Sequence, residues 1–252
     1  MILERLEVKS KQGAIPAVAL SPPDARGAAL VIHSYGGSKE EVLGLASRIA
    51  ELGLVAYAMD LGGHGQNPRR FNRGVVEEVE AVIAHLQRLG RVVAVGHSLG
   101  GRLALASAAD YAFAISPALA RAYGAATRNG LDAFRSYRVR EASQAVNLDL
   151  LRSLPEWRPG PLPAAIAFGS RDVPEIIEAC RAVAALGADV TEIPRAMHQD
   201  IIQLEATFEV LEKRLRAWFP RPVIEPPTGR GEVRHGTADG GRCLMPSKHL
   251  LT

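Results

Sequence analysis

The segment Gly96-His97-Ser98-Leu99-Gly100-Gly101 carries the residues with the clearest chemical potential. It follows the apolar run RVVAV and precedes RLALASAA, whose small apolar residues are typical of a buried helix. A serine between such a strand and such a helix lies on a tight turn, with its hydroxyl exposed at the helix N-terminus, where free N–H groups favour a developing negative charge. The flanking glycines fit that turn because side chains there would collide with neighbouring backbone. The alternative is a plain glycine-rich turn; the placement favours a nucleophilic Ser98.

A serine nucleophile needs a base to take its proton, and that base needs an acid to orient it. Between Ser98 and residue 219 the sequence contains one histidine, His198, in PRAMHQD after the run DVTEIP. Three aspartates compete for the role of the acid. Asp172 follows the apolar run AIAFG, Asp149 lies in an irregular region, and Asp200 is close to His198 and is expected to cap the last helix.

The elements that must position these residues alternate between strand and helix from residue 27 to residue 219. We expect strands at 2–8, 14–20, 27–33, 54–59, 91–95, 111–115, 163–168 and 188–193, and helices at 38–51, 75–89, 99–109, 174–186 and 201–218. The first two strands form a hairpin at the edge of the sheet. The alternation predicts an α/β fold: a mostly parallel, twisted central sheet of about eight strands, flanked by helices on both faces.

Two segments depart from this alternation of strands and helices. Residues 117–162 show no strand pattern and are expected to form a small helical cap inserted above the carboxyl ends of the strands. The cap carries more basic than acidic residues, which we interpret mainly as a solvated surface; the alternative is a mildly positive roof that favours anionic substrates. Residues 220–252 are rich in proline and glycine and are expected to be a disordered or loosely docked tail. The predicted organisation is one domain over 1–219, including the cap, followed by the tail.

Composition excludes several classes of protein. The chain has 252 residues and a net charge of +3, and residues 221–252 hold five basic and three acidic residues, so there is no dense basic stripe for nucleic acid. Two cysteines do not make a disulfide framework. No apolar run is long enough to span a membrane, and the first residues do not resemble a signal peptide. We expect a cytoplasmic protein with neither nucleic-acid nor membrane partners; the oligomeric state stays open.

The order of H33SYGG37, D60LGGHG65 and G96HSLGG101, each after an apolar strand, resembles the α/β-hydrolase superfamily over roughly residues 2–219. The likeness is to its serine esterase, dienelactone-hydrolase-like and serine-aminopeptidase-like branch. In that superfamily the chain order is nucleophile, acid, base. The resemblance therefore implies a catalytic set of Ser98, Asp172 and His198, with Asp172 in a loop like the family's Gly-x-x-Asp.

The resemblance also implies an oxyanion hole built from the backbone N–H groups of Leu99 and Tyr35. The family usually has glycine after the first histidine of its His-Gly-x motif, and this sequence has Ser34 there. If that position requires positive φ, serine strains it; otherwise its hydroxyl lines the substrate site. His97 is expected to pack internally or to line the substrate.

We expect a serine hydrolase that cleaves a small carboxylic ester through an acyl-enzyme, with a small acyl substrate and water as its partners and with no cofactor and no metal. His33, His64 and Asp60 are expected to stabilise loops. The alternatives are a peptidase, or an acyltransferase or thioesterase, on the same residues, and a non-catalytic ligand-binding protein of the same fold.

Overall fold

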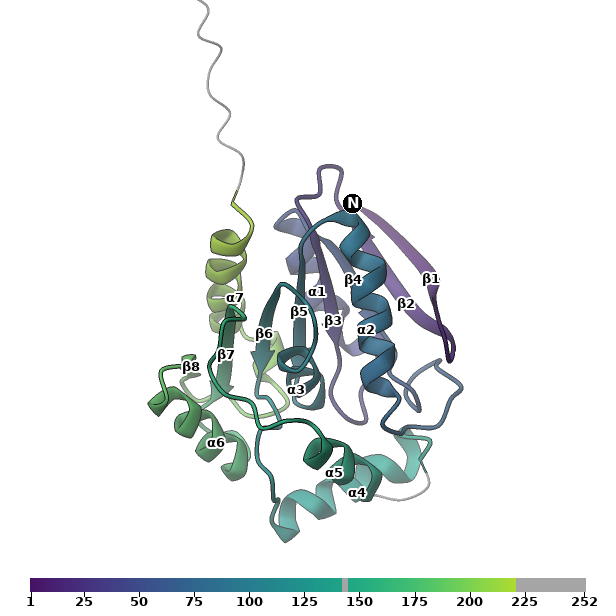
Figure 1. Cartoon of the computed structure of the whole chain (residues 1–252). Coiled ribbons are helices and arrows are strands. Elements are labelled where there is room, and N and C mark those ends of the chain that lie inside the picture. Colours follow the sequence, from purple (N-terminus) through teal and green to yellow (C-terminus); the bar gives the residue numbers. More distant parts are fainter. Residues whose placement is uncertain (142–144, 221–252) are drawn as a thin grey trace, which may run out of the picture. The chain divides into compact units, whose positions relative to one another are not determined.

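A computed structural model describes residues 1–141 and 145–220. Its centre is one eight-stranded sheet with the order β1-β2-β4-β3-β5-β6-β7-β8 (Figure 1). The strands are β1 (Ile2–Ser10), β2 (Gly13–Ser21), β3 (Ala28–Ile32), β4 (Val55–Met59), β5 (Val92–His97), β6 (Tyr111–Ile115), β7 (Ala164–Gly169) and β8 (Asp189–Ile193). β1 pairs with β2 and β2 with β4 in antiparallel fashion, and all other pairs are parallel. The predicted fold class and edge hairpin are confirmed.

Helices cover both faces of the sheet, because its central strands are apolar on both sides. They are α1 (Leu43–Glu51), α2 (Val75–Leu86), α3 (Leu99–Leu105), α4 (Ala125–Arg138), α5 (Ala145–Ser153), α6 (Pro174–Ala185) and α7 (Glu205–Trp218), with 3-10 turns η1 (Lys39–Val42), η2 (Gln87–Leu89) and η3 (Ile201–Gln203). Three expected helices therefore begin or end in a 3-10 turn. The helix after Ser98 is shorter than predicted and ends at Leu105.

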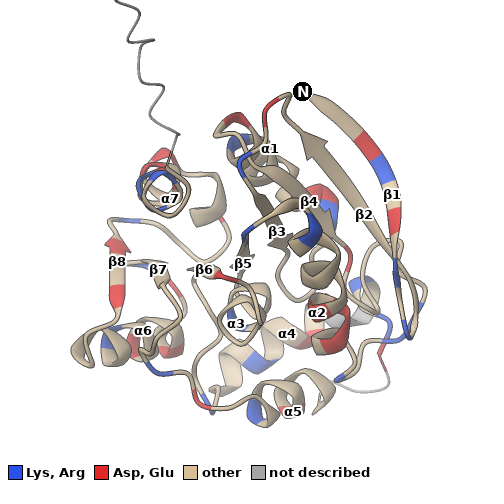
Figure 2. Cartoon of the chain, turned by 45° about the horizontal axis from the view of Figure 1, so that its top comes forward, with Lys and Arg blue, Asp and Glu red and all other residues tan. Residues whose placement is uncertain are grey.

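Strand β5 shows how side-chain alternation divides the core. Val92 and Ala94 pack with α2, α3 and α5 on one face, whereas Val93 and Val95 pack with α1 and α7 on the other. Successive side chains of a strand point to opposite faces, so a continuous apolar run fills both layers. Figure 2 shows the charged residues outside this centre, on β1, β8 and the helices. The central strands therefore form a rigid platform whose carboxyl ends share one edge.

Between β6 and β7 the chain forms α4 and α5. Both helices lie near the carboxyl ends of the strands (Figure 1). Leu150, Leu151 and Leu154 bury their side chains in the same core cluster as α2 and α3. That residues 117–162 form a separate cap insertion stays a prediction, and the expected tail falls, apart from Pro220, outside the described residues. None of the helices in the described ranges is long and apolar enough to cross a membrane.

Candidate active site

Ser98 lies in a strained turn between β5 and α3. Its φ of 54° and ψ of −110° place it outside the regions that non-glycine residues ordinarily adopt. The surrounding backbone fixes this conformation: the Ser98 N–H donates to the Ile115 carbonyl at 2.9 Å, and the Ser98 carbonyl accepts from the Arg102 N–H at 3.0 Å. Strain of this kind persists only where neighbouring contacts over-determine it.

The glycines around Ser98 are needed for close backbone approach. A Cβ on Gly96 would lie 2.2 Å from the Gly100 carbonyl carbon, and one on Gly100 would lie 2.3 Å from the Ile32 carbonyl oxygen. Neither backbone atom can move without displacing β3 or α3. A side chain at either glycine would therefore collide with backbone atoms, as predicted from the sequence.

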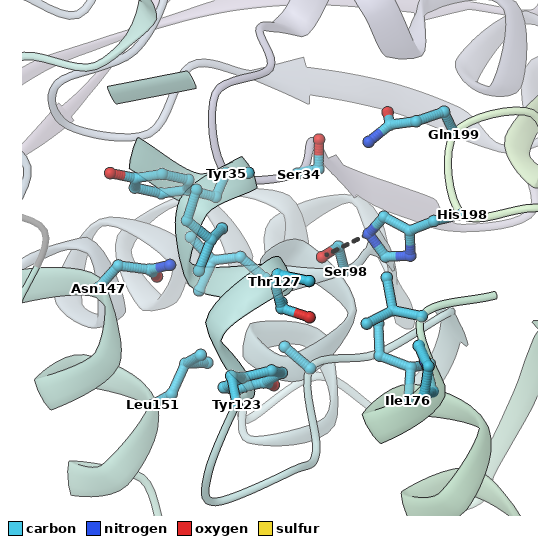
Figure 3. Close-up of a pocket in the computed structure, with 17 residues that line it drawn as sticks. Ser34, Tyr35, Ser98, Tyr123, Thr127, Asn147, Leu151, Ile176, His198 and Gln199 are labelled. Atoms are coloured by element: carbon cyan, nitrogen blue, oxygen red, sulfur yellow. Dashed lines mark hydrogen bonds between the residues drawn. The ribbon is translucent and has the colours of Figure 1, made fainter. Parts of the chain in front are cut away.

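The structure brings together Ser98, His198 and Asp172, which lie on three different loops. The Nε2 atom of His198 is 3.1 Å from Ser98 Oγ, and its Nδ1 atom is 2.7 Å from Asp172 Oδ1. Figure 3 shows the His198 ring beside Ser98 at the edge of a cavity. Because the carboxylate accepts from Nδ1–H, the lone pair of Nε2 faces the serine hydroxyl. This is the geometry in which a histidine removes a proton from a serine.

Asp172 is buried but stays ionised. Burial alone would raise its pKa, but hydrogen bonds from His198, Ser116 and the Val173 N–H outweigh burial and lower the pKa below its usual value. Ser116 Oγ donates to Asp172 Oδ2, and the Val173 N–H donates to Oδ1 at 2.7 Å. Both carboxylate oxygens are therefore held, which fixes the direction of the bond to His198.

The loops that carry Asp172 and His198 are braced against each other. The Ser170 N–H donates to the Ile193 carbonyl, and the Arg171 N–H donates to the Ala196 carbonyl, each at 3.0 Å. Asp200 accepts from the Met197 N–H at 2.7 Å through its side chain, and no side-chain cap bond is made at η3. The expectation that Asp200 caps the last helix is wrong: its carboxylate instead closes the loop that carries His198.

Leu99 and Tyr35, the residues expected to supply the oxyanion hole, both border the cavity beside Ser98. Leu99 is the first residue of α3, where N–H groups have no partner within the helix. Leu99, Tyr35 and Ser34 all line the cavity that contains Ser98. Ser34 is absent from the described non-glycine residues with positive φ, so the substitution of serine for the family's glycine causes no such strain here.

His97 lies outside the cavity lining. Its ring is 2% exposed, and its Nε2–H donates to the His198 carbonyl at 2.8 Å. The burial of the ring lowers the pKa of His97 to about 3, so it stays neutral. Of the two roles considered for His97, the structure therefore supports internal packing, and the substrate-lining role is corrected: His97 supports the loop of the base.

His33, His64 and Asp60 hold the loops after β3 and β4. The Leu61 N–H donates to His33 Nε2 at 3.2 Å, and the Gly36 N–H donates to His64 Nε2 at 3.0 Å. Asp60 accepts from the Lys39 backbone N–H at 2.8 Å and from Lys39 Nζ at 2.6 Å. The loop-stabilising roles predicted for these residues match these contacts.

The cavity beside Ser98 has a volume of about 350 Å³. Its walls come from the loop after β3, the start of α3, helices α4 to α6, and the His198 loop. Most of its lining is apolar, including Leu131, Leu151 and Ile176, and none of the described residues in it is charged. The volume is at the low end of the range for ligand pockets, which points to a small ligand.

Comparison with known proteins places this chain in a family. The family model described as "Alpha/beta hydrolase family" matches residues 29–223, well over half of the chain. The chain belongs to the alpha/beta hydrolase family. A search of curated protein sequences found no match.

Solved structures share the fold of this α/β-hydrolase at low sequence identity. An esterase from Pyrobaculum calidifontis is 19% identical, with a TM-score of 0.65 over 86% of this chain and 84% of that one. A thermophilic esterase from Thermogutta terrifontis is 15% identical, with a TM-score of 0.62 over 86% and 99%. Carboxyl esterase 2 from Tuber melanosporum is 15% identical, with a TM-score of 0.63 over 86% and 87%.

Two residues of the α/β-hydrolase site were not identified from the sequence. Ser116, which follows β6 with a φ of 47°, is bonded to the Asp172 carboxylate. Asn147, on α5, lines the cavity and is 2% exposed. The position of Ser116 directly after a strand was a usable signal, because strand ends gather at one edge. Asn147 lies in a segment without regular pattern and gave none.

Proposed function

We propose that this α/β-hydrolase is a serine hydrolase that cleaves a small carboxylic ester. The observation that carries the proposal is the continuous set of contacts from Asp172 to His198 to Ser98, which ends at the wall of the cavity. A ligand in the cavity places its carbonyl next to Ser98 Oγ. The structural neighbours that are esterases support this substrate class by likeness of fold.

In the proposed mechanism Ser98 Oγ attacks the acyl carbon while His198 Nε2 takes the hydroxyl proton. The N–H groups of Leu99 and Tyr35 stabilise the oxyanion, and each such donor is worth about 10²–10³ in kcat. His198 then gives its proton to the departing alcohol, which leaves an acyl-enzyme on Ser98. A water molecule, deprotonated by His198, attacks the acyl-enzyme and releases the acid. Asp172 stays ionised and holds the His198 ring in position.

The lining of the cavity favours an ester over a peptide. A peptidase that recognises a charged chain end needs an oppositely charged partner, and no charged side chain lines the described part of the cavity. Acyl transfer to another alcohol or thiol, and thioester hydrolysis, use the same three residues. Both stay alternatives within the same mechanism. A non-catalytic binding role stays a separate alternative.

Labelling with a fluorophosphonate tests the mechanism directly. We expect one adduct on the wild type by intact mass, and no adduct on Ser98→Ala or His198→Ala. Ser98→Ala should keep the wild-type Tm, because it removes only one oxygen from the cavity wall. The wild type should also hydrolyse short 4-nitrophenyl esters, and Ser98→Ala should lose this activity by a factor of about 10⁴ or more.

Two results would count against the proposal. Equal ester hydrolysis by wild type and Ser98→Ala would remove Ser98 from the mechanism. A folded wild type that takes up no probe would favour the non-catalytic binding role. The location in the cytoplasm and the absence of nucleic-acid and membrane partners, expected from the sequence, stay predictions.

A further inference from the structure

Asn147 places a buried amide in the wall of the cavity. It lies four residues before Leu151 on α5, so the two side chains share one helix face, and both line the cavity. Asn147 is 2% exposed, and its Oδ1 atom has no hydrogen-bond partner among the described residues. Figure 3 shows its amide nitrogen directed towards the interior of the cavity.

The packing around Asn147 gives no reason for an amide. Its helix neighbours Leu150, Leu151 and Leu154 are buried in the core. A leucine has the same number and branching of side-chain heavy atoms and would occupy the position without a polar group. Burying an amide without a partner costs free energy, because its hydrogen bonds to water are lost and not replaced. A ligand oxygen that accepts from the Nδ2–H₂ group, which faces the cavity, would recover part of that cost.

The position of Asn147 assigns it to the acyl group of the substrate. His198 delivers the proton to the departing alcohol, so the alcohol lies on the His198 side of Ser98. In Figure 3 Asn147 and His198 lie on opposite sides of Ser98. The part of the cavity next to Asn147 therefore receives the acyl chain, and the amide contacts a group some distance along that chain.

Charge restricts what this group can be. The basic residues near the cavity have partners of their own: Arg138 pairs with Glu41 at 3.0 Å, and Arg140 donates to backbone carbonyls of residues 64–67. With no charged side chain in the described lining, a carboxylate or ammonium group on the acyl chain would be buried without a counter-charge. The group is therefore uncharged. The amide nitrogen that faces the cavity is a donor, so a ketone or a hydroxyl oxygen on the acyl chain accepts a hydrogen bond from it.

We propose that Asn147 is a specificity residue that selects uncharged acyl groups carrying a ketone or hydroxyl oxygen beyond the scissile carbonyl. The inference rests on the proposed function, since it takes the cavity as the acyl site. The volume of about 350 Å³ limits the acyl group to a short chain.

Matched esters test the selection. 4-Nitrophenyl esters of pentanoate, hexanoate and heptanoate are compared with those of 4-oxopentanoate, 5-oxohexanoate and 6-oxoheptanoate, each corrected for its spontaneous hydrolysis. We expect the wild type to favour at least one oxo ester over its plain counterpart by about tenfold in kcat/KM. Asn147→Leu should abolish or invert that preference, which is measured as the ratio of kcat/KM for the oxo ester to kcat/KM for the plain ester within each variant. A preference that survives in Asn147→Leu, or a wild type without any preference, overturns the inference.

Leu151→Val is the matched control, because it reshapes the same helix face one turn away without changing polarity. It should alter plain and oxo esters in parallel. The Tm of Asn147→Leu gives an independent readout: loss of an unpaired buried amide should leave Tm unchanged or raise it. A fall in Tm by several degrees would show that Asn147 serves the fold, and would overturn the inference.

Failure of the proposed function is separated from failure of this inference by a binding measurement. In Ser98→Ala, calorimetry gives the Kd of the N-methyl amides of hexanoate and 5-oxohexanoate, which need no turnover. We expect the oxo amide to bind about tenfold more tightly, and this difference to vanish in Ser98→Ala with Asn147→Leu. Equal Kd values for the two amides in Ser98→Ala overturn the selection whether or not the wild type hydrolyses esters.

Discussion

A single side chain, that of Ser116, helps to fix both the orientation and the charge of Asp172. It is fully buried and donates to Asp172 Oδ2, while His198 occupies Oδ1. The two contacts stop the carboxylate from rotating and favour its charged form. In the proposed mechanism Ser116 therefore acts through Asp172, as a positioning residue.

We expect Ser116→Ala to lower kcat/KM roughly ten- to hundredfold, because hydrogen bonds to charged groups contribute about 1.5–3 kcal/mol. The pKa of Asp172 should rise when this donor is lost, so Ser116→Ala should lose more of its activity than the wild type as the pH falls towards 4. Ester kinetics between pH 4 and 8 measure both effects. Ser107→Ala is the control, since the Ser107 hydroxyl donates to the nearby Ala104 carbonyl of α3, which ends at Leu105.

Ser116→Gly separates the hydroxyl from the backbone. Ser116 has a φ of 47°, a conformation that glycine adopts without strain. If the hydroxyl matters, the glycine variant should be as slow as the alanine variant. Wild-type activity in Ser116→Gly would contradict the positioning role.

At the scale of elements, the segment after α4 is fixed to the loop that follows β4. The Arg140 N–H donates to the Gly63 carbonyl at 2.9 Å, and the Arg140 carbonyl accepts from the Phe71 N–H at 2.8 Å. Tyr35 extends the link, because its hydroxyl donates to Glu141. The wall of the cavity that α4 forms and the loop that carries Tyr35, a proposed oxyanion donor, are thus joined. Movement of α4 therefore changes the position of both.

We expect Arg140→Met to raise KM about threefold to tenfold with a smaller effect on kcat, because its guanidinium contacts position the wall and not the reacting atoms. The loss of these bonds should lower Tm by about 2–4 °C, as for roughly 1 kcal/mol in a chain of this size. Arg152→Met is the control: Arg152 is exposed and pairs with Asp149 on the same helix. Equal KM values in both variants would show that the wall does not depend on Arg140.

At the scale of the whole molecule, three buried neutral histidines make the fold sensitive to acid. Burial lowers the pKa of His33 to about 4, and that of His64 and of His97 to about 3. In the unfolded chain each would titrate near its usual pKa of 6.5. Below pH 6.5 the unfolded state therefore binds more protons than the folded state. Their contribution to stability is complete above pH 6.5 and is lost as the pH falls towards 4.

We expect the free energy of unfolding to fall steeply between pH 6.5 and 4, by up to about 1.4 kcal/mol per pH unit for each histidine. Urea titrations at a series of pH values measure this slope. His97→Gln removes one titrating ring and should reduce the slope by about one third. A stability that stays constant from pH 6.5 to 5 would mean that the three rings accept protons in the folded state.

The sequence by itself determined the sheet, its edge hairpin and the approach of the three proposed catalytic residues. Apolar runs and glycines report local conformation, and parallel strands bring their carboxyl ends to one edge of the sheet, so Ser98, Asp172 and His198 could be placed near one another from their positions after strands. The need for glycines around Ser98 could be predicted from the geometry of a tight turn alone.

Only the tertiary structure decided which side chains surround those residues. Ser116 and Asp172 are 56 residues apart, and their contact depends on the left-handed backbone of Ser116, which no sequence pattern indicates. The same holds for His97, which supports the His198 carbonyl from inside the fold, and for Asn147, whose helix turns it into the cavity. Periodicity describes one element at a time, whereas these contacts depend on how loops and helices from distant parts of the chain pack together.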